Sequence, residues 1–449
     1  MNADEFDDLA LARLSRPAPL PGGLSRRRFL QLAGAGAGAA SIGTMISNLD
    51  AFAAPPVGAG DGILVMIMME GGNDGLNTVV PTGESRYYQL RPGLAIPAAS
   101  ALPIAAGVGL HPALVKLKAR FDQGDVAVVQ GVGYANPDLS HFTSMGIWMN
   151  GWGGGAQPGG PTGWLGRYLD GLPNAATESL YGAVIGTSVP LHMVGSVARA
   201  SGLPQNIGGA FGLDRRDPSD ARMFDAIGAF SGGATGIGQW GDMVAQVEHN
   251  TLELTQRIQP AYQGTFPDSH LGRQLTLAAK LINTNLGIRV FSTSIGGFDT
   301  HSGQSGDHAN RLSEIDGALD AFFTTLSPAW RSRVTVMTFS EFGRRPERND
   351  DLGTDHGTAA PLFVVGSKVK GGVYGNPSRT TDLDRYGNLK HHIDFRSVYA
   401  TVLETWLRAD STQVLGYNFA KLGLFEGGPD GGSTATSRPS RYRRKRLTV

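Results

Sequence analysis

Five continuous apolar runs, separated by amphipathic stretches, dominate the hydrophobic pattern of this chain. Each run is short and lies close to glycine or polar turn residues, a pattern typical of strands that are buried on both faces of a sheet. The runs cover residues 62–69, 126–132, 289–294, 334–339 and 362–365. The sequence therefore predicts a sheet of mostly parallel strands.

Helical patterns lie between these runs. In the stretch from residue 311 to 326, apolar side chains recur at three- and four-residue steps, as on the buried face of a helix. Similar stretches cover residues 111–121, 271–286 and 395–407. Because buried strands alternate with amphipathic helices, we expect an α/β fold in which a mostly parallel sheet is sandwiched between helices.

The N-terminal segment has the pattern of a twin-arginine signal peptide. Residues 25–31 read Ser-Arg-Arg-Arg-Phe-Leu-Gln, the form that the twin-arginine translocase reads. A weakly apolar stretch follows, and residues 51–53 form an Ala-x-Ala cleavage signal. We expect residues 1–53 to be removed and the mature chain to be periplasmic or extracellular. An uncleaved signal that acts as an anchor is the alternative.

Composition limits the rest of the chain. The sequence has no cysteine, which excludes disulfides and thiolate metal sites, and its formal net charge is zero. We expect one α/β domain over residues 54–426, with a Gly/Pro-rich insertion near 151–238. Residues 427–449 form a flexible linker and basic tail, expected to be solvated or to contact an anionic envelope polymer or lipid. Nucleic acid is not an expected partner.

Acidic and histidine side chains flank the apolar runs. Ligands bind beyond the carboxyl ends of strands in open α/β sheets, and imidazole and carboxylate are ligands of Zn, Mn, Fe and Mg. The sequence therefore predicts a divalent-metal site. Candidate residues are Glu70, Asn73, Asp74, Ser140, Asp299, His301, Glu341, Asp355 and His356.

Some of these candidates have simpler interpretations. Asp299 is also suited to capping a helix or turn, and the Asp355–His356 pair to a glycine-flanked turn. Ser140 is suited to capping a helix that begins at His141, and equally to acting as a nucleophile, since helix N-terminal amides stabilise an anion.

Five motifs together resemble a known family. They read GGNDGLNTVVP, NPDLSHFTSMGIW, GGFDTHSGQ, TFSEFGRRPERN and GTDHGTAAPLFVVG, and span roughly residues 62–407. They look like the twin-arginine-exported family of unknown function numbered fifteen-oh-one, which resembles the alkaline phosphatase/sulfatase superfamily. The resemblance implies an alkaline-phosphatase-like sheet between helices. It also implies a site that usually holds two divalent metals, with a Ser or Thr nucleophile at a helix N-terminus.

Carried onto this chain, the resemblance makes Asp74 the first carboxylate ligand and Ser140 the nucleophile. Asp299 and His301 resemble the ligand pair of the next strand, although the superfamily commonly uses a longer spacing between the two.

Glu341 and Phe342 stand where the superfamily often has Asp-His, so one imidazole ligand is missing. His356 then supplies the final histidine, or else Asp355 and His356 form that pair themselves. A single-metal or degenerate site therefore stays open. Zinc is the first expectation for the metal, with Mn, Mg, Ca or Fe as alternatives.

The leading hypothesis is an exported metal-dependent hydrolase of phosphate or sulfate esters, acting on a small-molecule or glycan substrate. Ser140 would attack, and Arg344 or Arg345 would clamp an anionic oxygen. One alternative is a non-catalytic exported protein that binds an anionic glycan or polymer on the same fold. Another is a metal-free ester hydrolase, because residues 71–74 match the Gly-x-Asn-Asp block of the GDSL-type lipases.

Overall fold

The computed structural model describes most of the expected α/β domain. It covers residues 55–153, residues 161–205 apart from 177, 179, 187 and 199, the positions 218, 219, 221, 222 and 225, and residues 257–427. The chain divides into two compact units, and the unit formed by Asp50–Gly212 and Leu254–Val449 contains the sheet and the candidate site. The expected signal peptide and the basic tail after residue 427 lie outside the described residues. Within the described part, no helix has the length and apolar character needed to cross a bilayer.

A nine-stranded sheet, counted over the described residues, forms the centre of this unit. Its central strands are buried along their whole length, as the continuous apolar runs predict. In spatial order the strands are β11 (Gly372–Tyr374), β5 (Val126–Gly133), β10 (Ala360–Val365), β9 (Val334–Phe339), β1 (Ile63–Met69), β8 (Val290–Ile295), β6 (Gly182–Ile185) and β7 (Ala200–Leu203), with β12 (Ile393–Asp394) paired to β5.

The sheet is parallel except for β10, which pairs antiparallel with both β5 and β9. The other neighbouring pairs are parallel. Because β10 runs the opposite way, it begins at the edge where its neighbours end. Loops that follow β1, β5, β8 and β9 therefore meet the loop that precedes β10 at one edge of the sheet.

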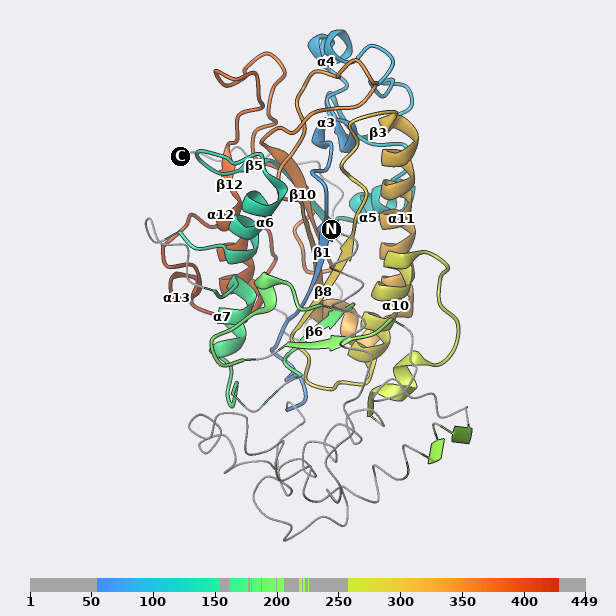
Figure 1. Ribbon diagram of the computed structural model, residues 1–449, viewed down its shortest axis with the longest axis vertical. Helices are drawn as coiled ribbons and strands as arrows, with labels where there is room; N and C mark the ends of the chain where they lie inside the picture. Colours follow the sequence, from blue (N-terminus) through green and yellow to red (C-terminus); the bar gives the residue numbers. More distant parts are fainter. Residues whose placement is uncertain are drawn as a thin grey trace, which may run out of the picture. The chain divides into compact units, whose positions relative to one another are not determined.

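Helices cover both faces of the sheet, so the α/β sandwich predicted from the sequence is what the structure shows (Figure 1). One side carries α5 (Val115–Gln123), α10 (His270–Asn283) and α11 (Gln304–Thr325). The other carries α6 (His141–Asn150), α7 (Trp164–Asp170), α12 (Phe395–Thr401) and α13 (Ser411–Leu415). On α11, Leu312, Ile315 and Leu319 are buried, as the helical spacing of its apolar residues predicts.

The region expected to be an insertion, residues 151–238, contributes to the main sheet where the structure describes it. It contains α7, and its strands β6 and β7 extend the sheet beyond β8. These strands of the expected insertion are therefore part of the sheet. They are short, and their sequences GAVI and ASGL contain glycine, so they carry no strong periodic signal.

A small antiparallel sheet follows β1 along the chain. It consists of β2 (Val79–Val80), β4 (Val108–Leu110) and β3 (Leu102–Ala105). The short helices α3 (Gly75–Thr78) and α4 (Ser85–Leu90) belong to the same stretch of chain. Arg91, directly after α4, is fully buried.

Two glycines differ in whether their surroundings leave room for a side chain, and this difference gives a first prediction. Gly71 has a φ of +116°, and a Cβ there would lie 2.4 Å from the backbone nitrogen of Asp299. Gly71→Ala is therefore expected to destabilise the fold by roughly 1–3 kcal/mol. Gly317 lies inside α11 with open space around it, so Gly317→Ala is expected to stabilise by about 0.5–1 kcal/mol. Urea unfolding measures both, and an equal tolerance of alanine at the two positions would contradict this account.

Candidate metal centre

Three side chains from three separate loops converge at the edge of the sheet described above. His141 is the first residue of α6, after β5; Asp299 follows β8; and His356 precedes β10. One potential ligand atom from each lies within 4.8 Å of the other two. Among the described residues, this is the group of histidine and acidic side chains whose spacing could hold a metal ion.

A third imidazole, that of His301, lies against two members of this group. Its Nε2 is 3.0 Å from Oδ1 of Asp299 and 3.0 Å from Nε2 of His356. The Nε2 of His141 is 3.4 Å from Oδ2 of Asp299, and that of His356 is 3.2 Å from Oδ1. Three imidazole nitrogens thus surround one carboxylate.

The other ring nitrogen of each histidine faces an oxygen that accepts a hydrogen bond. Nδ1 of His141 lies 2.7 Å from the Glu341 carboxylate, and Nδ1 of His301 lies 3.2 Å from the Asp355 carboxylate. Nδ1 of His356 lies 2.8 Å from a backbone carbonyl, that of Leu139. Since carboxylate and carbonyl oxygens only accept, each Nδ1 is assigned as the donor, which leaves the lone pair of a neutral ring on Nε2.

The resulting arrangement places acceptors against acceptors. The Nε2 atoms of His301 and His356 lie against each other and against the carboxylate of Asp299, and Nε2 of His141 is buried without a hydrogen-bond partner. Buried polar atoms normally have partners. Metal-bound histidines typically donate their second N–H to a carboxylate or carbonyl in this way. The donor set of imidazoles and carboxylate therefore fits a divalent metal such as zinc.

Arg344 positions Asp299 instead of offering a free guanidinium to a substrate. It is buried, and its Nη2 donates to Oδ1 of Asp299 at 2.6 Å. Its other N–H groups donate to the backbone oxygens of Gly72, Phe298 and Thr354, and Nη1 also lies 3.5 Å from Nε2 of His301. Burial raises the pKa of Asp299, but the hydrogen bond and charge of Arg344 outweigh it and bring that pKa down to about 2. Arg344 is therefore engaged with the protein and not placed as a clamp for an anion.

Glu341 was expected as a metal ligand. Its carboxylate instead accepts a hydrogen bond from the ring of His141. One carboxylate oxygen accepts from His141 and from the backbone N–H of Gly71 at 2.9 Å. The other accepts from the hydroxyl of Ser340 at 3.0 Å. Its side chain is almost fully buried, so the carboxylate fixes the ring of His141 from behind. Phe342 packs against the rings of His141 and His356 and forms an apolar wall beside them.

This placement gives a prediction for Glu341→Gln. The change keeps the shape of the side chain but removes the charge that holds the Nδ1 proton of His141. We expect zinc affinity to fall by roughly 10- to 100-fold with little change in fold. Competition with a chromophoric chelator measures the affinity. Glu347→Gln, at an exposed position, is the matched control, and equal affinities for the two variants would contradict the assigned role.

Asp74, also expected as a ligand, lies outside the group. Its buried carboxylate forms an ion pair with Arg91 at 2.5 Å and accepts from the amide of Gln304. It also caps α3 by accepting from the backbone of Asn77. Burial raises the pKa of Asp74, but the charge of Arg91 reverses this and holds the pKa below its ordinary value. These partners account for a structural carboxylate.

The network around Asp74 supports the loops that carry the candidate ligands. Gln304, which donates to Asp74, also accepts from the hydroxyl of Thr354 at 2.6 Å. Arg91 donates to the backbone oxygens of Arg345 and Pro346. The loop that holds His356 is thus tied to the buried ion pair. Sequence reasoning missed Arg91 and Gln304, because no local pattern links either residue to Asp74.

Asn73 and His308 form a second buried connection behind the site. Nε2 of His308 lies 3.0 Å from the amide oxygen of Asn73, which also accepts from Thr78. Burial lowers the pKa of His308 to about 4, so the ring is neutral. Asn73 is therefore part of a buried hydrogen-bond network that stabilises the glycine-rich turn behind the site.

Ser140 is the N-cap residue of α6 and directly precedes His141. Its side chain is exposed and caps no helix N–H, so the hydroxyl is not committed to the role of a helix cap. Asp355 supports His301 and accepts from Asn349 at 3.3 Å. His141 itself was expected only to begin a helix, although it follows an apolar run as the other candidates do.

Comparison with known proteins places the chain in a family. The chain is similar to a solved protein of the alkaline phosphatase superfamily from Vibrio parahaemolyticus, with 10% identity over 94% of this chain and 80% of that one and a TM-score of 0.31. It is also similar to the PsFucS1 sulfatase from Pseudoalteromonas sp., with 12% identity over 84% and 74% of the two chains and a TM-score of 0.35. No curated protein matches. The pattern of one family matches residues 63–419, and the chain belongs to that family, described as protein of unknown function (DUF1501).

Proposed function

We propose that this protein is an exported, divalent-metal-dependent hydrolase of phosphate or sulfate esters. The observation that carries the proposal is the orientation of three imidazoles around Asp299. Each has its Nδ1 against an oxygen acceptor and its Nε2 turned toward the same carboxylate. His141, His301, His356 and Asp299 would hold the metal. When bound, a divalent metal supplies a Lewis acid that lowers the pKa of a nearby hydroxyl and offsets negative charge on an ester oxygen.

The chain's own nucleophile in this proposal is the hydroxyl of Ser140. It is exposed to solvent, and it is joined directly to a candidate ligand, His141. The first backbone N–H groups of the ten-residue α6 have no partners within the helix, so they favour an anion at this position. An ester of phosphate or sulfate brings such an anion.

Arg344 and Glu341 act as positioning residues. Arg344 holds Asp299 from the side of the sheet, and Glu341 holds His141. Phe342 is buried and packs against the rings of His141 and His356, so it would keep water from the ring faces that it covers. These contacts would preorganise the metal ligands before substrate arrives.

The test uses the purified protein loaded separately with Zn, Mn and Mg, and assayed on p-nitrophenyl phosphate and p-nitrophenyl sulfate. We expect turnover of one of these esters, which a chelator abolishes. Ser140→Ala is expected to lose at least about 10²-fold in kcat while it retains its metal, because only the nucleophile is removed. Ser100→Ala, at another exposed serine, is the control.

Two results would redirect the proposal. A folded, metal-loaded protein that is inert on both esters would favour the non-catalytic binding protein. Activity on carboxylic esters that survives chelation and Ser140→Ala would favour the metal-free ester hydrolase.

Export is part of this proposal and rests on residues 25–31 and 51–53 alone. The twin-arginine translocase would be the partner, and it transports folded proteins, so a metal could be bound before export. Cell fractionation checks this part. Accumulation of the wild-type protein in the cytoplasm, with its N-terminus intact, would contradict it.

A further inference from the structure

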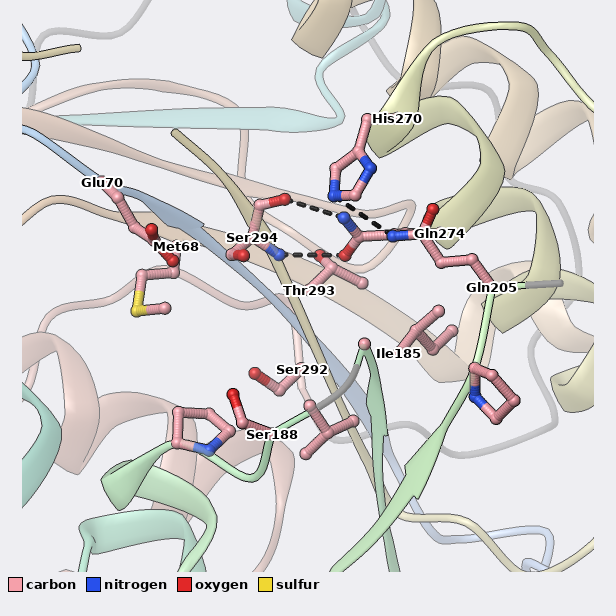
Figure 2. A pocket seen from close by; sticks show the side chains of 14 residues that line it. Met68, Glu70, Ile185, Ser188, Gln205, His270, Gln274, Ser292, Thr293 and Ser294 are labelled. Carbon is pink, nitrogen blue, oxygen red and sulfur yellow. Dashed lines mark hydrogen bonds between the residues drawn. The ribbon is translucent and has the colours of Figure 1, made fainter. Parts of the chain in front are cut away.

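A pocket with a volume of about 480 Å³ opens at the carboxyl ends of β1, β6, β7 and β8 (Figure 2). This volume lies within the range of small-molecule sites, and the carboxyl ends of strands are the usual position of ligands in α/β sheets. The group at the candidate metal centre, formed by His141, Asp299, His301 and His356, does not line it. The pocket is therefore a separate feature that the proposed hydrolase chemistry does not use.

The pocket exists because β8 is longer than its neighbour β6. The pairing of the two strands ends at Val184 and Ser292, whereas β8 continues to Ile295. Gln274 of α10 takes the place of the missing strand. Its amide donates to the backbone oxygen of Ser294 at 2.9 Å and accepts from the backbone nitrogen at 3.0 Å, as Figure 2 shows.

Polar groups on the pocket wall remain available for a ligand. Gln274 forms hydrogen bonds only with the backbone of Ser294. The hydroxyl of Ser294 has no hydrogen bond within the described part of the chain. The same holds for the hydroxyl of Ser188 and the carboxylate of Glu70. His270 and Gln205 contact each other at 3.1 Å on another part of the wall.

The charge of the wall excludes an anionic group as its ligand. The residues that line the pocket include no lysine or arginine, and Glu70 contributes a carboxylate to the wall. A phosphate or sulfate would meet this negative charge without a cation to balance it. The pocket is therefore chemically unlike the candidate metal centre.

Apolar side chains form another part of the wall, with Met68, Ile185 and Pro190 among them. A ligand that fits must offer C–H groups to these side chains and hydroxyl groups to Glu70, Ser188 and Ser294. A sugar ring in its pyranose form has both. We propose that this pocket binds a neutral, polyhydroxylated ring, such as one hexose unit of a glycan.

This site goes beyond the proposed ester hydrolysis and does not depend on it. Glu70 lines the pocket, and the next residue, Gly71, donates to Glu341 beside the candidate metal centre. The backbone thus connects the two sites directly. Together with the proposed ester hydrolysis, the pocket would hold a sugar unit of an ester-bearing glycan.

The test titrates the full chain with methyl α-glucoside, methyl α-galactoside and methyl α-mannoside, followed by ligand-observed NMR and calorimetry. We expect saturable binding of at least one glycoside. Glu70→Ala removes the acceptor and Ser188→Trp fills the mouth of the pocket, and each is expected to weaken binding at least tenfold. Glu347→Ala and Ser100→Trp, at exposed positions outside the pocket, are the matched controls and should bind as the wild type does.

The sugar titration is repeated with chelated protein and with His356→Ala, and both are expected to retain binding. A protein that binds the glycoside but hydrolyses no ester leaves this inference standing while the proposed function fails. The inference is overturned if none of the glycosides binds, or if the two pocket variants bind as well as their controls. It is also overturned if inorganic sulfate or ethanolamine binds in the pocket in place of the sugars.

Discussion

His141→Ala is expected to abolish ester hydrolysis, with a loss in kcat/KM of about 10³-fold or more. The change removes an imidazole whose Nε2 is buried, unpartnered and 3.4 Å from the carboxylate of Asp299. A catalytic metal contributes several kcal/mol to transition-state stabilisation, and each 1.36 kcal/mol corresponds to roughly a factor of ten in rate. Steady-state kinetics together with the metal content of the same preparation measures the effect.

The control for this prediction is His392→Ala. His392 is exposed and lies beside β5, where its backbone nitrogen donates to the backbone oxygen of Gly131. This variant should retain both metal and activity. If His141→Ala lost activity but kept its metal, His141 would have a role other than metal binding. If His141→Ala kept full activity, His141 would not belong to the site.

Asp74→Ala is expected to destabilise the protein by about 3–5 kcal/mol, the largest change in stability that we predict. Asp74 and Arg91 are both fully buried, so removing the carboxylate leaves a guanidinium charge without its partner. Arg91→Ala should have a comparable effect, and the double variant should cost less than the sum of the two, because the residues share one interaction. Urea unfolding of the three variants measures the coupling.

The exposed ion pair between Lys116 and Asp320 provides the matched control. Its side chains are 52% and 39% exposed, so Asp320→Ala is expected to cost at most about 1 kcal/mol. If Asp74→Ala were no more harmful than Asp320→Ala, the buried ion pair would not support the site as described. Loss of metal without loss of stability in Asp74→Ala would return Asp74 to the set of ligands.

The strands at the centre of the sheet were predictable because they are buried on both faces. Such strands need apolar side chains at every position, and the run at 334–339 coincides with β9. The short strand β6, which lies between β8 and β7, gave no comparable signal. It has four residues, and the amide of Gln274, not another strand, satisfies the backbone of β8 beyond its end.

The direction of β10 decides which residues meet at the site, and an apolar run carries no direction. His356 precedes β10, so it would lie at the opposite edge of the sheet if that strand were parallel to its neighbours. The antiparallel pairing with β5 and β9 brings it to His141 and Asp299 instead. Sequence reasoning therefore identified His356 as a candidate without a reason for its position.

The roles of the acidic residues could not be predicted from residue type. Asp74, Asp299 and Glu341 all follow apolar runs, yet they differ in their partners. Asp74 meets Arg91, 17 positions later, and Gln304, 230 positions later. Glu341 meets the Nδ1 of His141. Only tertiary contacts separate a ligand from a carboxylate that positions a ligand.

The most direct test of the metal centre is a crystal structure of the zinc-loaded protein with an anomalous difference map recorded at the zinc edge. The account predicts a peak enclosed by Nε2 of His141 and His356 and the carboxylate of Asp299, with His301 beside it. A map with no peak among these atoms, or with its peak at Asp74 and Glu341, would contradict the account.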